Sequence, residues 1–382
     1  MNFKNLKRKL LGKKAGAAVG TAVKVLTSVV LGASMLAGTY GIVKTTVVPT
    51  AQNKVSSMFE VTDTITADGA GGSGGVIIPD PVTGITRSGV LLEGCKYTLA
   101  DGTELSVGDS IPETPSANDV YEEGDYKYTY SRNKKVEHPE YYGTMWSVVV
   151  NNTGKTEYGE IVSTIAGQPV TNMYKTFAGC NNLIASPNIP SSVTSLLSTF
   201  EGCTALTVAP TIPSNVIIMQ STFNGCSSLT TAPTIPNNVT DMTQTFSYCT
   251  SLNTYIGSTD LDGDFSNYII PDSVTSMHST FEGCSAITAA PAISSNVTNI
   301  SGAFSECTSL ITAPVIPSGI ELMCGTFYNC SSLEGTIIIN SENLIALYSC
   351  FENTIKPITI RGTSTQLTEL AATANNGNVT VA

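Results

Sequence analysis

The stretch that decides the fold is TFNGCSSLTTAPTIPNNVTDM, residues 222–242. Its apolar positions are a phenylalanine, a cysteine and a leucine at three-residue steps, followed by an alanine, an isoleucine, a valine and a methionine. They are too sparse for the stripe of an amphipathic helix and too irregular for one long strand. Polar residues and prolines separate them, which favours a tightly turning coil. One such unit cannot bury its apolar side alone, so we expect several units to stack.

The same unit recurs through the second half of the chain. The pairs of phenylalanine and cysteine are Phe177/Cys180, Phe200/Cys203, Phe223/Cys226, Phe246/Cys249, Phe281/Cys284, Phe304/Cys307 and Phe327/Cys330. Successive phenylalanines lie 23 residues apart, as in 200 − 177 = 23, except where 281 − 246 = 35. An eighth copy at Phe351 has Thr354 in the cysteine position. This period predicts a solenoid in which each Phe packs on the next Phe, with coils about 4.8 Å apart.

The pattern resembles the leucine-rich repeats of the BspA-like type, which are found on bacterial surfaces. The resemblance rests on the Phe-x-x-Cys-x-x-Leu core and on the continuation at Ile235–Met242, with related copies at Ile212–Val216 and Ile270–Met277. It implies a leucine-rich-repeat solenoid over residues 166–361, with about eight 23-residue coils. Because such a family is defined by packing, the resemblance says little about function.

Ten cysteines raise the question of disulfide bonds. Seven of them occupy one repeat position, where a small apolar side chain has to fit inside the coil, so we expect buried free thiols. A ladder of thiols does not surround a point as zinc ligands must, so we expect no metal site. Cys324 and Cys350 lie off the ladder, near the C-terminal end, and a bridge there stays open; Cys95 lies in another region.

Charge is unevenly distributed along the chain, whose net charge is −11 at pH 7. Residues 1–54 hold nine Lys or Arg and no acidic residue, which leaves 19 − 9 = 10 basic and 30 acidic residues in 55–382. No Lys or Arg occurs from Thr176 to Ile355. Binding to nucleic acid needs clustered cations, so we expect no nucleic-acid partner for the repeats.

The N-terminus combines cations with a long apolar stretch. Residues 4–14 hold six Lys or Arg, and residues 25–43 carry no charge. About 20 apolar residues span a bilayer as a helix, and preceding cations keep the N-terminus in the cytoplasm. We therefore expect a basic cytoplasmic segment (1–24), a transmembrane or signal-anchor helix (25–45) and an extracellular remainder at the cell surface. A cleaved signal peptide, which would give a secreted protein, is the alternative.

This N-terminal segment resembles small pilin-like or mobile-element membrane proteins of Gram-positive bacteria, through Val30-Leu31-Gly32-Ala33 and Val47-Val48-Pro49-Thr50. The resemblance implies self-association through the N-terminal helix. Residues 46–83 are expected to extend that helix and then to form a linker, because DGAGGSGG at 68–75 is flexible by composition.

Residues 84–165 are richer in tyrosine and charge. They predict a hairpin around residues 96–107, strands at Tyr126–Tyr130 and Trp146–Val150, and a short helix at Glu157–Ala166. A solenoid needs its end coils covered, so we expect a β-rich N-terminal cap domain here and a C-terminal cap at 362–382, with a strand at 378–381. The expected fold class is thus an α+β repeat protein. The alternative for this region is a small binding module with an aromatic surface made from its tyrosines and Trp146.

No catalytic constellation is present in the sequence. The two histidines, His138 and His278, are isolated, and no Ser/His/Asp or Cys/His arrangement surrounds either. No glycine motif for a nucleotide follows a strand and opens a helix. We expect neither an enzyme nor a cofactor.

Two features are candidates for ligand binding. One is the acidic insertion at 255–268, where clustered carboxylates either bind calcium or, as we favour, form a solvated loop. The other is the expected strand face after each repeat leucine, which is small and uncharged and suits broad contact with a protein. The candidate ligand-binding residues are Tyr255, Asp260, Asp262, Asp264, Thr207, Thr230, Thr231, Thr254 and Thr288.

These observations predict a membrane-anchored extracellular repeat protein that binds a protein or cell-surface partner in adhesion or recognition. The alternative is a structural, pilin-like filament subunit whose N-terminal helix polymerises and whose solenoid is displayed. The sequence leaves open the identity of the ligand, the oligomeric state and the fate of residues 1–45.

Overall fold

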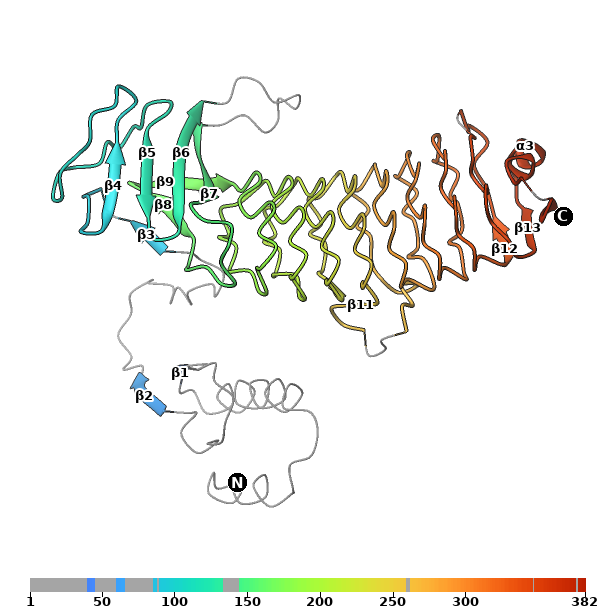
Figure 1. The fold of residues 1–382 in the computed structure, drawn as a ribbon, viewed down its shortest axis with the longest axis horizontal. Coiled ribbons are helices and arrows are strands. Elements are labelled where there is room, and N and C mark those ends of the chain that lie inside the picture. The colour runs from blue at the N-terminus through green and yellow to red at the C-terminus, as the bar shows by residue number, and fades with distance from the viewer. Residues whose placement is uncertain are drawn as a thin grey trace, which may run out of the picture. The chain divides into compact units, whose positions relative to one another are not determined.

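The structure is a computed structural model that describes residues 40–44, 60–65, 85–87, 89–132, 144–258, 262–345, 347–375 and 377–382. The chain divides into two compact units, Met1–Ile78 and Pro79–Ala382. Nearly all the described residues belong to the second unit. It contains a β-sheet, a long array of coils and a small C-terminal sheet with one helix (Figure 1).

In the first unit, the described residues form two antiparallel strands, β1 (Tyr40–Lys44) and β2 (Glu60–Ile65). The predicted helix at 25–45 and its extension in 46–83 are therefore wrong at these two segments, where β-branched residues favour a strand. The rest of both predictions lies outside the described residues. Among the residues that the structure describes, no helix is long and apolar enough to cross a membrane.

A seven-stranded sheet opens the second unit, in the order β3-β8-β9-β7-β6-β5-β4. Its strands are β3 (Ile85–Arg87), β4 (Cys95–Thr98), β5 (Val120–Glu123), β6 (Tyr126–Arg132), β7 (Thr144–Val150), β8 (Val162–Ile165) and β9 (Gln168–Asn172). The strands predicted at Tyr126–Tyr130 and Trp146–Val150 are confirmed as β6 and β7. The turn predicted after Thr98 is also present, because Leu99 N–H donates to the Thr103 carbonyl oxygen at 2.8 Å.

The aromatic residues of this sheet form its core. Tyr126, Tyr128 and Tyr130 alternate along β6, and each is at most 4% exposed, while Trp146 opposite them on β7 is fully buried. Tyr97 packs edge-on against Trp146, with ring centroids 6.2 Å apart. The prediction of an aromatic binding surface is therefore wrong for these residues. Side chains alternate between the two faces of a strand, so the three tyrosines of β6 all lie on its buried face.

The helix predicted at Glu157–Ala166 is also wrong. Val162–Ile165 is strand β8, which turns through Ala166 and Gly167 into the antiparallel strand β9. Both turn residues have positive φ (49° and 77°), as a tight two-residue hairpin requires. Only one helix, α3 (Leu367–Ala372), occurs among the described residues, so the helical part of the α+β prediction has little support there.

The sheet passes directly into the coils. Asn172 at the end of β9 forms a parallel bridge with Ser195, and the Thr176 hydroxyl donates to the Val148 carbonyl oxygen of β7 at 2.7 Å. From there on, the repeat phenylalanines stack with ring centroids 5.3–5.9 Å apart. Tyr126 of β6 lies edge-on against Phe177, with ring centroids 6.3 Å apart, so the aromatic packing continues into the sheet.

Two lines of parallel bridges join successive coils. One runs through the second residue after each repeat leucine, as in Val208 with Thr231, and the other through the second residue after each repeat valine, as in Ser195 with Ile218. The strands are very short, namely β10 (Thr231–Ala232) and β11 (Thr254–Tyr255). Proline follows most repeat leucines after four residues, as at Pro233, and it cannot donate to a ladder.

A longer strand forms in the coil of Phe327, where Ile337 stands in place of that proline. This strand, β12 (Gly335–Ile338), pairs in parallel with β13 (Ile358–Arg361). β14 (Val379–Val381) pairs with β13 in turn, which confirms the strand predicted at the C-terminus. Helix α3 follows β13 and buries Leu370 at this end of the array (Figure 1).

Candidate functional site: the exposed faces of the coils

The repeat cysteines form a ladder inside the coils, and their buried thiols have low reactivity. Each thiol from the second coil onward donates to the carbonyl oxygen of the phenylalanine one coil earlier at 3.0–3.1 Å, as Cys203 does to Phe177. Burial raises the pKa of Cys226 from 9.0 to about 12, so little of the reactive thiolate forms at neutral pH. All ten cysteines are free thiols, so the bridge left open between Cys324 and Cys350 is not formed.

The predicted strand face exists as a row of neighbouring residues on successive coils. We define the strand face as the first and second residues after the repeat leucine (or Ile287 in its place) in the first six coils: Ile184, Ala185, Thr207, Val208, Thr230, Thr231, Asn253, Thr254, Thr288, Ala289, Ile311 and Thr312. Backbone bonds link neighbouring coils, for example Thr230 N–H to the Thr207 carbonyl oxygen at 3.1 Å, but between Asn253 and Thr288 the link passes through Gly263 of the insertion. The structure therefore brings Thr207, Thr230, Thr231 and Thr254 together, and it places Thr288 on the far side of the insertion.

The exposure of the strand face differs between positions. Thr207 and Thr230 are exposed, Thr231 and Thr288 are half-buried, and Thr254 is only 8% exposed. Thr254 is therefore too buried to contribute much to a contact surface. Exposed aliphatic residues on the same face were not among the predicted ligand-binding residues, namely Ile184, Val208 and Ile311, which are 51%, 54% and 43% exposed. The face is thus apolar as well as uncharged, a composition that suits contact with a protein.

The described part of the insertion at 255–268 packs against the coils on both sides of it and is not only a solvated loop. We call the residues Tyr255, Phe265 and Tyr268 the packed wedge. Thr254 forms a parallel bridge with the preceding coil, and Asp264 forms one with the following coil, so the insertion adds a strand position on this side of the array. Phe265 is fully buried there, and its ring lies 5.5 Å from that of Tyr255. The Tyr268 hydroxyl donates to the Pro233 carbonyl oxygen at 2.7 Å.

Tyr255 therefore packs within this wedge instead of standing out as a ligand contact. Asp262 and Asp264 are exposed, and each carboxylate accepts a backbone N–H two residues later. Asp260 lies outside the described residues. Among the residues that the structure describes, no group of three or more His, Cys, Asp or Glu could hold a metal ion. Binding of calcium at the insertion was the less favoured alternative, and the described carboxylates form no cluster for it.

A groove at another corner of the coils was missed by the sequence analysis. It has a volume of about 610 Å³, and its floor and wall come from the second and fourth residues after each repeat phenylalanine. These are Tyr248, Gly283, Glu306, Asn329 and Asn353 along one row, and Thr250, Ser285, Thr308, Ser331 and Ile355 along the other. The signal in the sequence is a change at the second position, which is glycine in the first three coils and, apart from Gly283, a larger residue in the later ones.

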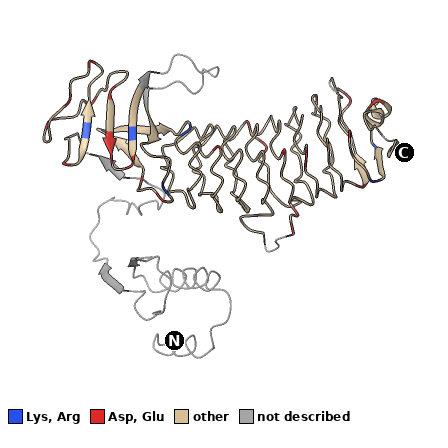
Figure 2. Ribbon diagram, viewed as in Figure 1, with Lys and Arg blue, Asp and Glu red and all other residues tan. Residues whose placement is uncertain are grey.

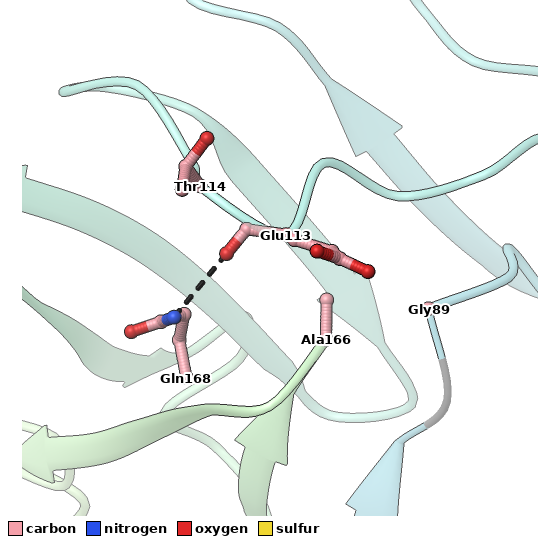
Figure 3. Close-up of a pocket in the computed structure, with 5 residues that line it drawn as sticks. All are labelled: Gly89, Glu113, Thr114, Ala166 and Gln168. Atoms are coloured by element: carbon pink, nitrogen blue, oxygen red, sulfur yellow. Dashed lines mark hydrogen bonds between the residues drawn. The ribbon is translucent and has the colours of Figure 1, made fainter.

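A smaller hollow lies in the seven-stranded sheet, between the β8–β9 turn and two loops (Figure 3). Its volume is about 430 Å³, and Gly89, Glu113, Thr114, Ala166 and Gln168 line it. The Gln168 side-chain amide donates to the Glu113 carbonyl oxygen at 3.2 Å. Its lining holds one carboxylate and one side-chain amide, which already donates to a backbone oxygen, so the hollow offers no constellation for catalysis.

Charge is sparse on the coils, and acidic side chains are scattered along them, while Lys and Arg are visible on the strands of the sheet (Figure 2). The coils thus present neutral surfaces interrupted by single carboxylates. Neither the strand face nor the groove is lined by a cation among the described residues.

Comparison with known proteins identifies the repeats. Residues 171–262 and 259–376 match the model of the BspA type leucine rich repeat region, in six copies. Residues 4–62 match a family of unknown function, DUF6133, so the pilin-like resemblance of the N-terminus is not confirmed. No curated protein matches the chain.

Solved structures with a similar fold are also leucine-rich-repeat proteins. One is a leucine rich repeat protein of T. pallidum, which is 25% identical to this chain. The match covers 55% of this chain and 88% of that protein, with a TM-score of 0.42. Another, from Bacteroides ovatus, is 19% identical, covers 67% and 75%, and has a TM-score of 0.35. A leucine rich cell surface protein of Faecalibacterium prausnitzii is 18% identical, covers 70% and 94%, and has a TM-score of 0.27.

Proposed function

This chain belongs to the family of BspA type leucine rich repeats, and from that membership we propose that it is a recognition protein that binds a protein partner through its strand face. Leucine-rich repeats are in general binding modules and not enzymes. The observation that carries the proposal is the strand face, in which exposed Ile184, Val208 and Ile311 lie among uncharged threonines and only the insertion, at Gly263 and Asp264, interrupts the row. Burial of such aliphatic side chains supplies affinity, and the hydroxyls between them supply hydrogen bonds.

The ends of the array support this role by keeping the coils rigid. We propose that the seven-stranded sheet caps the first coil, since Tyr158 covers Phe177 and Thr176 bonds to β7. At the other end, the Phe351 N–H donates to the Thr373 hydroxyl oxygen at 3.1 Å. Terminal units with a polar outer side close an otherwise open core.

Site-specific photo-cross-linking tests the partner surface. A photoreactive amino acid replaces Val208 or Thr312 on the strand face. As matched controls, it replaces the exposed Thr275 or Thr298, which lie beside the other line of bridges. In cells that make the full chain, we expect one discrete protein adduct shared by the two strand-face positions and missing from the controls. Adducts only from Thr275 and Thr298, or none from the strand face, would overturn the proposed surface.

Membrane anchoring and external display are a further part of the proposal. They are supported by the cations in residues 4–14 and the uncharged stretch at 25–43. Proteolysis of intact cells tests them, because we expect the repeats to be cut while a cytosolic control protein stays intact. Equal protection of both proteins would contradict external display.

The filament subunit stays the alternative, and electron microscopy of purified material separates it from the recognition protein. We expect dispersed particles both from the full-length chain and from a chain without residues 1–45. Filaments that need residues 1–45 would favour the alternative.

A further inference from the structure

The groove of about 610 Å³ differs in chemistry from the strand face. One of its two rows contains the second residue after the repeat phenylalanine of each successive coil: Tyr248, Gly283, Glu306, Asn329 and Asn353. We call this line of residues the groove row. Because neighbouring coils lie about one strand spacing apart, the groove offers a new side chain at each step of roughly 4.8 Å.

The centre of the groove row holds one hydrogen-bond donor group and one acceptor group that have no hydrogen-bond partner among the described residues. The Asn353 side-chain amide donates to the Asn329 side-chain oxygen at 2.8 Å, and Asn375 donates to Asn353 in the same way. Asn329 therefore ends the ladder with its amide hydrogens directed to no described acceptor. On the next coil, the half-buried Glu306 carboxylate accepts no hydrogen bond from a described residue. A hydroxyl group can accept from the amide and donate to the carboxylate at once.

An aromatic ring lies at one end of the groove row. The Tyr248 ring packs over the backbone of Gly283, where an added Cβ would lie 2.5 Å from its Cδ1 atom. The Tyr248 hydroxyl lies 3.2 Å from a carboxylate oxygen of Glu282, which fixes the ring further, and 44% of the residue stays exposed. The exposed part is a flat apolar surface on which the C–H face of a sugar ring can pack.

The second row of the groove supplies oxygen acceptors. The hydroxyls of Thr250, Ser285 and Ser331 each donate to the carbonyl of the equivalent residue one coil earlier, at 3.3 Å. Their hydrogens are thus engaged, and their oxygens keep lone pairs that can accept hydrogen bonds from a ligand in the groove. A ligand rich in hydroxyl donors matches this wall.

The backbone of the groove row is closed to an added strand. Tyr248 N–H donates to the Glu282 carbonyl, Gly283 N–H to Ser305 and Glu306 N–H to Tyr328, at 2.6–2.8 Å. An extended peptide gains its affinity in strand addition from unpaired backbone groups, and the N–H groups of these three residues are all paired already. The carboxylate of Glu306 and the lack of a lining cation also disfavour an anionic polymer.

We propose that this groove binds a linear, neutral oligosaccharide, with a sugar hydroxyl bridging Asn329 and Glu306 and one sugar ring packed on Tyr248. The site lies apart from the strand face and does not depend on a protein partner. A linear glycan suits it because its successive hydroxyl groups meet successive coils.

The test uses the full-length chain on an array of linear neutral hexasaccharides of glucose, mannose, galactose and xylose. The array also carries the hexamer of galacturonic acid and random decapeptides. We expect at least one neutral hexasaccharide to bind, and the galacturonate hexamer and the peptides to bind about tenfold more weakly or not at all. Calorimetry with the bound hexasaccharide then compares the variants Glu306→Ala and Asn329→Ala with Ser227→Ala, which lies in the hydroxyl row outside the groove.

Glu306→Ala and Asn329→Ala should each weaken binding by about tenfold or more, because each removes one of the two groups that hydrogen-bond the bridging sugar hydroxyl. Ser227→Ala should leave binding unchanged, and melting temperatures will show that all three variants are folded. No binding by any neutral hexasaccharide overturns the proposal. So does binding that survives both groove variants, or preferential binding of peptides or galacturonate.

Discussion

The thiol of Cys226 donates a hydrogen bond to the backbone oxygen of Phe200, one coil earlier, across 3.1 Å. That oxygen also accepts the N–H of Cys203 at 3.0 Å, so it is held from its own coil and from the next. The repeat cysteine thus has two roles, as a small apolar group in the core and as a donor between coils. This relationship recurs along the ladder and makes the cysteine position sensitive to substitution.

Replacement of Cys226 separates these two roles. We expect Cys226→Ala to lower the free energy of unfolding by about 2 kcal/mol, since it loses the donor and leaves a small cavity. Cys226→Ser should also lower stability but by less, because its hydroxyl keeps a donor near the Phe200 oxygen. Denaturant unfolding of both variants checks this order. A larger loss for Ser than for Ala would show that apolar packing outweighs hydrogen bonding at this position.

Thiol chemistry gives a second prediction. Eight cysteines are buried, and two, Cys95 and Cys324, are half-buried. We expect a disulfide reagent at neutral pH to react readily with these two in the native chain and with all ten after unfolding. Rapid reaction at Cys226 or Cys249 in the native chain would contradict the buried ladder.

The same burial predicts how stability depends on pH. The pKa of Cys226 is raised to about 12 in the folded chain from an ordinary 9.0. The unfolded thiol therefore loses its proton first as pH rises, so its contribution is fully present below pH 9.0 and is lost as the pH rises toward 12. We expect the melting temperature to fall over this interval, and less steeply in Cys226→Ala.

Backbone strain offers a stabilising substitution. Ser198 has a φ of 52°, in the left-handed region, and the equivalent position is glycine in two later coils, at Gly302 and Gly325. Ser198→Gly should raise the free energy of unfolding by about 1 kcal/mol, because glycine adopts this region without steric strain. The matched control is Gly202→Ala, which places a side chain at a φ of 73° and should lower stability. A lower melting temperature for Ser198→Gly would contradict the strain at this position.

Two tyrosines test the packed wedge. Tyr268→Phe removes the hydroxyl that bonds the Pro233 carbonyl oxygen inside the wedge, and we expect a loss of about 1–2 kcal/mol. Tyr255→Phe is the control, since no described residue bonds its hydroxyl, and its effect should be near zero. Chemical denaturation compares the two. Equal effects would show that the Tyr268 bond contributes nothing to the insertion.

The array of coils could be predicted because its apolar pattern is strictly repeated. Phe223, Cys226 and Leu229 define the interior of one coil, and stacking follows from the inability of one coil to bury them. The shortness of the strands also has a local cause in the sequence, since Pro233 and its equivalents interrupt the ladder.

Other features depend on contacts that no single repeat encodes. The segment at Glu157–Ala166 contains the strand β8 because it pairs between β3 and β9, not because of a local period. Phe265 and Tyr268 fill a space that exists only once two neighbouring coils are in place. The groove depends on residues such as Glu306 and Asn329, which are free to vary because they do not pack inside a coil.

Hydroxyl-radical footprinting tests the central claim most directly, with the chain alone and in complex with the partner that cross-linking identifies. Oxidation of Ile184, Val208 and Ile311 on the strand face should fall several-fold in the complex. Ile345 and Tyr348, which are 73% and 78% exposed outside the strand face, should be oxidised equally in both samples. Protection of Ile345 and Tyr348 with an unprotected strand face would contradict partner binding at that face.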